Sequence, residues 1–208
     1  MSKSLIALCL VPLGLIPAQE LAPVALPTPQ TSGGKPLMQL LKERKSVRDF
    51  GPKQLSRQTL SNLLWAAWGI NREDGRRTAP SASNRQEIDV YAVMAEGAYL
   101  YDAKANALKP VAPADLRKLT GIQAFVADAP LNLVYVADTA KLNGDDAGSL
   151  ATANADTGFI AQNVYLFCAS EGLGTVVRGS VDRAPLAKAM NLRAQQRIIL
   201  AQSVGYPK

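Results

Sequence analysis

Arg44-Lys45-Ser46-Val47-Arg48 follows a short apolar segment and is closed by Asp49-Phe50. Guanidinium and ammonium groups neutralise a phosphate, and a serine hydroxyl donates a short hydrogen bond to it. The three cations and one hydroxyl of this stretch can therefore surround a phosphate group. A basic cluster at a helix end also occurs as a solvated terminus that interacts favourably with the helix dipole. The stretch alone leaves both interpretations open.

A second stretch with ligand-binding chemistry is Pro80-Ser81-Ala82-Ser83-Asn84-Arg85-Gln86. Its small side chains let the backbone approach a flat ligand, and its Ser and Asn groups can bond to carbonyl and ring nitrogen atoms. The same residues are also typical of an ordinary polar turn. A basic loop over 71–79, with Arg72, Arg76 and Arg77, comes directly before it.

Apolar residues at helical spacing predict two helices around the basic stretch. The first is a short helix over 37–44 that delivers the stretch at its C-terminal end. The second covers 56–69, with Ser56 as its N-cap and Gly69 as its stop. Trp65 and Trp68 on this helix are expected in the core or at a subunit interface.

The rest of the chain alternates between predicted strands and helices, with no repeat and no second domain. Strands over 88–95, 98–102 and 108–111 form a meander joined by tight turns. A strand over 131–137 is apolar on both faces, hence central. A helix over 149–171 is apolar around most of its circumference, so we expect it to be the buried helix of the domain or of a dimer. The remaining predicted elements are a helix over 113–119, a strand over 175–180, a helix over 182–190 capped by Asp182, and a strand over 197–204.

Composition excludes several kinds of chemistry. The chain has 208 residues, enough for one domain with a substantial core, and contains no histidine. That excludes Ser-His-Asp hydrolysis, Cys-His nucleophiles and His-ligated zinc, and we expect no metal centre. Its two cysteines, Cys9 and Cys168, are not expected to form a disulfide, because Cys9 lies in a segment that we expect to be removed. Chemistry must therefore come from a cofactor or from carboxylates, hydroxyls, Lys and Arg.

The chain is basic, with 23 Lys and Arg against 17 Asp and Glu, and the excess is concentrated at 44–57 and 72–85. Such a surface attracts anions, and nucleic acid is one candidate. The sequence has no helix-turn-helix pattern, no zinc-finger spacing and no aromatic platform beside the basic runs. We therefore expect no nucleic-acid partner.

The amino terminus is typical of an export signal. Lys3 precedes an apolar run over 5–18, which is shorter than the about 20 apolar residues that a membrane span needs. We expect a signal peptide over 1–18, removed after Ala18, and an exported, periplasmic protein without stable membrane insertion. A buried N-terminal helix is the alternative. Residues 19–36 contain Pro23, Pro27, Pro29 and Gly33-Gly34, which indicates an extended linker, so the folded domain is expected over 37–208.

Three stretches taken together resemble the nitroreductase family of FMN flavoproteins: RKSVRDF at 44–50, PSASNRQ at 80–86 and DTGFIAQNVYLFCASEGLGTVVRG at 156–179. VGYP at 204–207 closes the domain, so the resemblance covers roughly 37–208. It implies an α+β fold with a central, mainly antiparallel sheet flanked by helices, and a long buried helix at a dimer interface. Within the family, the hairpin EGAYLYDAKANALKPV at 96–111 looks most like the branch that includes the azoline (thiazoline/oxazoline) dehydrogenases of peptide-toxin biosynthesis.

The resemblance also implies FMN as cofactor, bound at two sites of a homodimer. By position, the family's phosphate, ribityl and pyrimidine contacts fall on Arg44, Ser46 and Arg48, with Lys45 among them. Arg48 is the candidate for the positive charge that the reduced flavin needs near N1 and O2, and a salt bridge with Asp49 or with a helix acid is its alternative role.

The other implied contacts come from three further segments. The loop that reaches the flavin from the other subunit corresponds to Pro80, Ser81, Ala82 and Asn84. The backbone beside flavin N5 corresponds to Val177, Arg178 and Gly179, and a polar residue near the ribityl or pyrimidine edge corresponds to Gln123. No side chain is assigned as catalytic, because the flavin carries the hydride.

The expected function is hydride transfer through flavin N5, from a reductant such as NAD(P)H to a small planar acceptor such as a nitroaromatic or quinone. A flavin-dependent dehydrogenase of a peptide or heterocycle and a non-catalytic flavin-binding protein are the alternatives. Family members often continue past the VGYP-like strand into a basic tail, whereas this sequence ends at Lys208. Either Lys208 and the loop over 72–77 replace that tail, or FMN binds more weakly.

Overall fold

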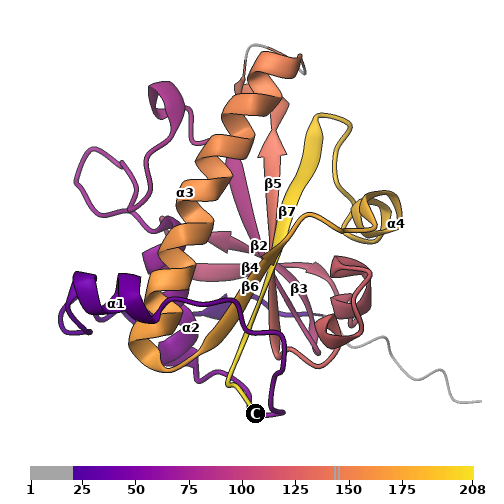
Figure 1. Ribbon diagram of the computed structural model, residues 1–208. Coiled ribbons are helices and arrows are strands. Elements are labelled where there is room, and N and C mark those ends of the chain that lie inside the picture. Colours follow the sequence, from indigo (N-terminus) through magenta and orange to yellow (C-terminus); the bar gives the residue numbers. More distant parts are fainter. Residues whose placement is uncertain (1–20, 143, 145) are drawn as a thin grey trace, which may run out of the picture.

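The computed structural model describes residues 21–142, 144 and 146–208, and the expected signal peptide over 1–18 lies outside them. In this described part, one seven-stranded sheet forms the centre of the domain, in the order β1-β4-β3-β2-β5-β7-β6, and every neighbouring pair is antiparallel (Figure 1). The strands are β1 (Val24–Ala25), β2 (Ile88–Met94), β3 (Gly97–Asp102), β4 (Ala107–Ala112), β5 (Leu131–Asp138), β6 (Gly174–Arg178) and β7 (Gln196–Gly205).

Helices cover both faces of the sheet, which confirms the α+β class. The α-helices are α1 (Leu37–Glu43), α2 (Arg57–Trp68), α3 (Ala147–Glu171) and α4 (Arg183–Ala189). Helices α2 and α3 contribute to the larger core on one face, and α4 contributes Leu186 to a second core on the other face. No helix among the described residues is long and apolar enough to cross a membrane.

The predicted meander and central strand are confirmed. Strands β2, β3 and β4 pair in sequence order, and β5 lies between β2 and β7. Every residue of β5 is buried, as a strand apolar on both faces requires.

Helix α2 begins and ends where local chemistry predicts. The Ser56 hydroxyl accepts a hydrogen bond from the Thr59 backbone N–H at 3.0 Å, and the Gly69 N–H donates to the Trp65 carbonyl at 2.8 Å. A β-carbon at Gly69 would come within 2.3 Å of the Trp65 ring, so this position has no room for a side chain. Trp68 is buried in the core, and the indole N–H of Trp65 donates to the Ile70 carbonyl.

Helix α3 is the predicted long helix, and it crosses one face of the sheet (Figure 1). Asp146 caps its start by accepting from the Ser149 N–H at 2.9 Å, and Gly172 ends it in the left-handed conformation, with φ 69°. Its inward side chains, including Ile160 and Val164, are fully buried, whereas Phe159 on the outer face is 48% exposed.

Three expectations were wrong in detail. The segment over 113–119 forms only a short 3-10 turn at Arg117–Thr120, and Asp182 precedes α4 without a capping hydrogen bond from its side chain. The described part of the expected linker belongs to the folded domain: β1 pairs with Leu108 and Ala107 of β4, and Leu26 is buried in the core. Prolines on both sides of β1 are compatible with an edge strand, because an edge strand leaves half of its N–H groups unpaired.

Candidate functional site

The basic stretch leaves α1 and runs alongside β6. The Val47 N–H donates to the Thr175 carbonyl at 2.9 Å, and a β-carbon at Gly174 would come within 2.8 Å of the Val47 side chain. Beyond the stretch, Phe50 is buried and forms an isolated antiparallel bridge with Pro207. The second half of the stretch is therefore fixed to the domain, while Lys45, Ser46 and Arg48 remain exposed.

One tyrosine joins the basic stretch to β6. The hydroxyl of Tyr165, on α3, lies 2.9 Å from the Ser46 hydroxyl and accepts a hydrogen bond from the Val177 backbone N–H at 3.0 Å. The Arg44 guanidinium lies 5.2 Å from the centre of the Tyr165 ring, in a cation-π arrangement. Tyr165 thus brings together three of the residues predicted to contact the flavin, on two different segments.

Tyr165 was not singled out from the sequence, where it contributed only to the apolar surface of a helix. Periodicity treats a helical tyrosine as core, and this one is indeed 8% exposed. The signal that sequence reasoning could have used is that a buried tyrosine hydroxyl has to find a polar partner.

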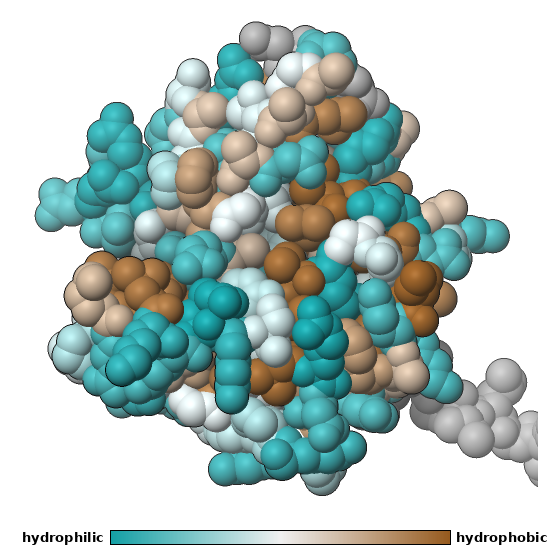
Figure 2. All heavy atoms as spheres, viewed as in Figure 1, coloured by the Kyte–Doolittle hydropathy of each residue, from teal (hydrophilic) through white to brown (hydrophobic). Residues whose placement is uncertain are grey.

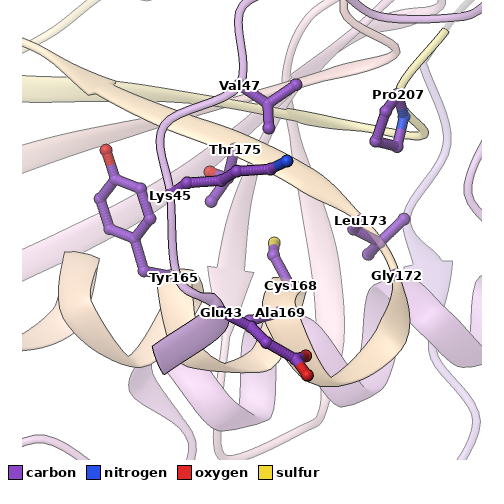
Figure 3. A pocket seen from close by; sticks show the side chains of 10 residues that line it. All are labelled: Glu43, Lys45, Val47, Tyr165, Cys168, Ala169, Gly172, Leu173, Thr175 and Pro207. Carbon is purple, nitrogen blue, oxygen red and sulfur yellow. The ribbon is translucent and has the colours of Figure 1, made fainter. Parts of the chain in front are cut away.

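A cavity of about 440 Å³ opens between the basic stretch, the C-terminal half of α3 and the start of β6, a volume suited to a small ligand. Figure 3 shows the Lys45 and Tyr165 side chains on one side of it and Leu173 and Pro207 on the other. The residues that line it are Glu43, Lys45, Val47, Tyr165, Cys168, Ala169, Gly172, Leu173, Thr175 and Pro207.

Cys168 and Glu43 do not act as reactive groups in this cavity. Burial raises the pKa of the Cys168 thiol far above neutral pH, so it is not a thiolate nucleophile. Hydrogen bonds from Lys35 and Gln39 lower the pKa of Glu43, whose carboxylate pairs with Lys35 at 2.8 Å. The Lys35 charge therefore compensates that carboxylate.

Arg178 has its side chain in the interior and not in the cavity. Its guanidinium donates to the Thr120 carbonyl at 2.6 Å and to the Asn132 side-chain oxygen at 2.9 Å. Burial lowers the pKa of Arg178 to about 10, so it stays protonated at neutral pH. The side chain is thus held by the protein, and the predicted flavin contact at Arg178 has to come from its backbone.

Gln123 lies beside the end of β6. The Ile122 N–H donates to the Ser180 carbonyl at 3.2 Å, which brings the segment over 121–123 against the end of the strand, next to Gly179. The Gln123 side-chain oxygen is buried and has no hydrogen-bond partner among the described residues. A β-carbon at Gly121 would lie 1.9 Å from an Arg178 guanidinium nitrogen, so Gly121 leaves the space that this arginine occupies.

Arg48 does not form the salt bridge with Asp49 that was the alternative to a flavin contact. Asp49 instead pairs with Lys208 at 3.1 Å, and Arg48 makes no ion pair within the described part of the chain. The Lys208 N–H also donates to the Asp49 carbonyl at 3.4 Å, so the C terminus lies beside the loop that follows α1 (Figure 1). An unpaired, exposed guanidinium is available to a ligand.

The stretch over 80–86 lies at the other end of α3. The Ala82 N–H donates to the Asp156 carboxylate at 2.9 Å, and Asp156 precedes Tyr165 by nine residues, which is about 14 Å along a helix. Ser83, Asn84 and Gln86 all have positive φ, so this segment is a specific turn and not an extended linker. A single chain therefore brings the basic stretch to the β6 end of the third stretch, near Gln123, and holds Ala82 at its Asp156 end.

The basic loop over 71–79 uses its arginines internally. Arg77 donates to the Gln86 side chain at 2.8 Å and to the Trp68 carbonyl at 2.9 Å, and Arg76 pairs with Asp74 at 2.7 Å. Burial lowers the pKa of Arg77, in keeping with a structural role. In this chain these two arginines hold the loop and do not reach the cavity beside Tyr165.

Comparison with known proteins agrees with the fold. The model of the nitroreductase family matches residues 41–206. A protein of Methanocaldococcus jannaschii assigned to the nitroreductases is 31% identical over 157 residues, which are 69% of this chain and 78% of that protein.

Solved structures give the same result. A crystal structure of a Ralstonia eutropha protein assigned to the nitroreductases is 41% identical, with a TM-score of 0.85 over 94% of this chain and 96% of that one. A Clostridium acetobutylicum protein assigned as an NADH oxidase shares the fold at 24% identity, with a TM-score of 0.59 over 81% of this chain and 87% of that one. The chain belongs to the nitroreductase family.

Proposed function

We propose that the chain is an FMN-dependent oxidoreductase that passes a hydride from a reductant such as NAD(P)H to a small planar acceptor such as a nitroaromatic or quinone. The observation that carries the proposal is the Tyr165 bridge. It fixes Ser46 and Val177, from two segments predicted to contact the flavin, beside one cavity.

The residues around the cavity fit the phosphate end of FMN. Lys45 lines the cavity, and Ser46 and Arg48 are exposed beside it. Arg44 is half-buried over the Tyr165 ring, which orients its guanidinium at the end of α1. Side chains that are already held in place by such contacts lose less conformational entropy when they bind a phosphate.

Bound FMN would supply the hydride chemistry, so the chain has to bind it, orient it and stabilise charge. The sequence has no histidine and the Cys168 thiol is buried, so neither is available as an acid or base at neutral pH. Arg48, unpaired and exposed, would place positive charge at the pyrimidine edge, where it favours the anionic reduced ring.

The proposal includes a homodimer. Leu37, Met38 and Leu41 on α1 and Phe159 on α3 are exposed apolar side chains, and Figure 2 shows hydrophobic surface where Figure 1 places α1. An apolar patch of this kind is typical of an interaction surface. A second copy would cover it and bring its own residues 80–86 to the flavin. Export of the chain remains part of the proposal and is checked by N-terminal sequencing of the protein recovered from the periplasm.

Rapid mixing with reductants tests the proposed function. The FMN-loaded protein is mixed with NADH, NADPH and dithionite in turn, and the reduced form is then mixed with a quinone, a nitroaromatic and oxygen. Reduction by NADH or NADPH followed by rapid reoxidation by the quinone supports the proposal. A flavin that only dithionite reduces contradicts NAD(P)H as the donor and points to a binding protein or to another donor. Reoxidation by oxygen without quinone turnover favours a dehydrogenase of a peptide or heterocycle.

A further inference from the structure

Glu87 is a buried carboxyl group with no visible hydrogen-bond partner. It directly follows the stretch over 80–86, its exposed fraction is 0%, and neither of its carboxylate oxygens has a hydrogen-bond partner among the described residues. Burying an ionised carboxylate without partners is strongly unfavourable, and such a group usually takes up a proton instead. Burial accordingly raises the pKa of Glu87 to about 7.

A second carboxyl group, that of Asp156 on α3, contributes to this shift. Asp156 is 3% exposed, and its proximity further raises the pKa of Glu87. One Asp156 oxygen accepts the Ala82 N–H, whereas neither Glu87 oxygen has a donor among the described residues. The proton therefore belongs on Glu87.

Among the described residues, Lys141 is the other charged group that acts on Glu87. Lys141 donates to the Gln86 carbonyl at 3.1 Å and lies 3.5 Å from the Asp89 carboxylate, so part of its charge is already compensated. The backbone N–H of Glu87 itself lowers the pKa of this carboxyl, and Lys141 does so to a smaller extent, but burial and Asp156 outweigh both. Arg85, on the loop itself, precedes Glu87 by two residues. The hydroxyl of Thr157, next to Asp156, is also buried without a partner among the described residues.

The loop attached to this pair adopts a conformation that needs support. Ser83, Asn84 and Gln86 have φ values of 53°, 53° and 49°, which cost free energy in residues other than glycine. The Gln86 N–H donates to the Ser81 hydroxyl at 3.0 Å, and the Ala82 N–H bond to Asp156 at 2.9 Å ties the loop to α3. The Asp156 carboxylate thus connects the Glu87 proton directly to the loop backbone.

We propose that Glu87 and Asp156 are a positioning pair whose shared proton holds the segment over 80–86 in place. When Glu87 loses that proton, two negative charges face each other in a buried site, and the loop moves to admit water. The inference rests on the proposed function, because this loop is the one assigned to the flavin of the other subunit. Flavin affinity should then fall as the pair ionises, for a reason separate from the titration of the FMN phosphate.

The test measures FMN affinity between pH 5.5 and 8.5 in wild type, Glu87→Gln and the control Glu96→Gln, which changes an exposed carboxyl on the turn after β2. Glutamine mimics the protonated acid. The ratio of the wild-type Kd to the Glu87→Gln Kd should therefore rise roughly tenfold between pH 6 and 8. The reason is that the protonated fraction of an acid falls tenfold per pH unit above its pKa. The FMN phosphate titrates equally in both proteins and cancels in this ratio. Glu96→Gln should follow wild type.

A second measurement works without flavin. In the full flavin-free chain, the protection of the Ala82 amide against hydrogen exchange should fall roughly tenfold between pH 6 and 8, relative to its protection in Glu87→Gln. Asp156→Asn, whose side-chain oxygen can still accept from Ala82, should flatten the dependence, because ionised Glu87 then meets no second negative charge.

The outcomes separate the two proposals. Equal Ala82 protection in wild type and Glu87→Gln at pH 6 and 8 overturns the positioning pair, whether or not FMN binds. FMN affinity with the same pH profile in both proteins overturns it too and leaves the proposed function standing. Absence of FMN binding at every pH, with the exchange difference present, overturns the proposed function alone.

Discussion

The hydroxyl of Tyr165 lies 2.9 Å from that of Ser46, although 119 residues separate them in the sequence. The same tyrosine hydroxyl accepts the Val177 N–H, so one atom on α3 fixes both the segment after α1 and strand β6. The two segments also touch directly, because the Val47 N–H donates to the Thr175 carbonyl, and the tyrosine adds a second connection between them. The relative positions of Ser46 and Val177, both predicted flavin contacts, therefore depend on Tyr165, which is not itself a predicted contact.

Tyr165→Phe should weaken FMN binding roughly tenfold to hundredfold. The phenyl ring keeps the packing and the Arg44 contact, but two hydrogen bonds worth about 1 kcal/mol each are lost and the Val177 N–H is left without its partner. Fluorescence titration with FMN measures the effect. Tyr99→Phe, which removes a tyrosine hydroxyl from β3, is the matched control, and equal affinities in the two variants would contradict the bridging role of Tyr165.

Arg44→Ala and Ser46→Ala should each lower FMN affinity by about 1 to 3 kcal/mol, the range for a hydrogen bond to a charged group. Riboflavin, which lacks the phosphate, should bind both variants about as well as it binds wild type. Arg57→Ala removes an exposed arginine on α2, away from the cavity beside Tyr165, and serves as the control. If Arg44→Ala retained full flavin occupancy, the phosphate assignment would have to be abandoned.

Arg48→Ala should lower the flavin reduction potential by about 30 mV, which for a two-electron couple corresponds to about 1.4 kcal/mol. The reason is that an unpaired cation near the pyrimidine edge stabilises the anionic reduced ring more than the neutral oxidised ring. Spectroelectrochemical titration of the FMN-loaded variant gives the potential. An unchanged potential, with Arg48→Lys and Arg48→Ala indistinguishable, would remove Arg48 from that role.

Gly121→Ala should destabilise the protein by about 2 to 4 kcal/mol. The new β-carbon would lie 1.9 Å from an Arg178 guanidinium nitrogen, so the buried cation would lose its bonds to the Thr120 carbonyl and the Asn132 side chain. Urea unfolding measures the change. Gly158→Ala is the control, because a β-carbon there meets nothing within 4 Å and alanine favours the helix by up to about 1 kcal/mol. Similar stabilities of the two variants would show that Arg178 adapts to the lost space.

The free energy of unfolding should fall as pH rises from about 4.5 to 7. Glu87 titrates near its ordinary pKa of 4.5 in the unfolded chain and at about 7 in the folded one, so the native state binds more protons across this window. Its contribution is fully present below pH 4.5, and about 3 kcal/mol is lost by the time the folded group has ionised. Glu87→Gln should remove this slope, so parallel stability curves for the two proteins would exclude the raised pKa.

Local chemistry made much of the fold predictable. Ser56 begins α2, and Gly69 and Gly172 end α2 and α3, through hydrogen bonds and backbone angles that depend on nearby residues. The largely apolar run of β5 is enough to place it in the centre of the sheet. Strand β1 was missed because a two-residue strand is stabilised only by its pairing with β4, more than 80 residues away.

The residues of the candidate site also divide into those that local sequence identifies and those that it does not. Arg44, Ser46 and Val177 could be identified because they lie in short motifs, and the structure brings them together. Tyr165 and Glu87 could not, because a bridging hydroxyl and a desolvated carboxyl acquire their properties from segments distant in sequence. Periodicity identifies such residues only as buried.

The visible absorption spectrum of the purified protein, followed by titration with FMN, tests the central claim most directly. Flavin bands in the purified protein, or saturable uptake of one FMN per chain that Arg44→Ala weakens, is the predicted result. A colourless protein that releases no flavin on denaturation and takes up none from added FMN would contradict it.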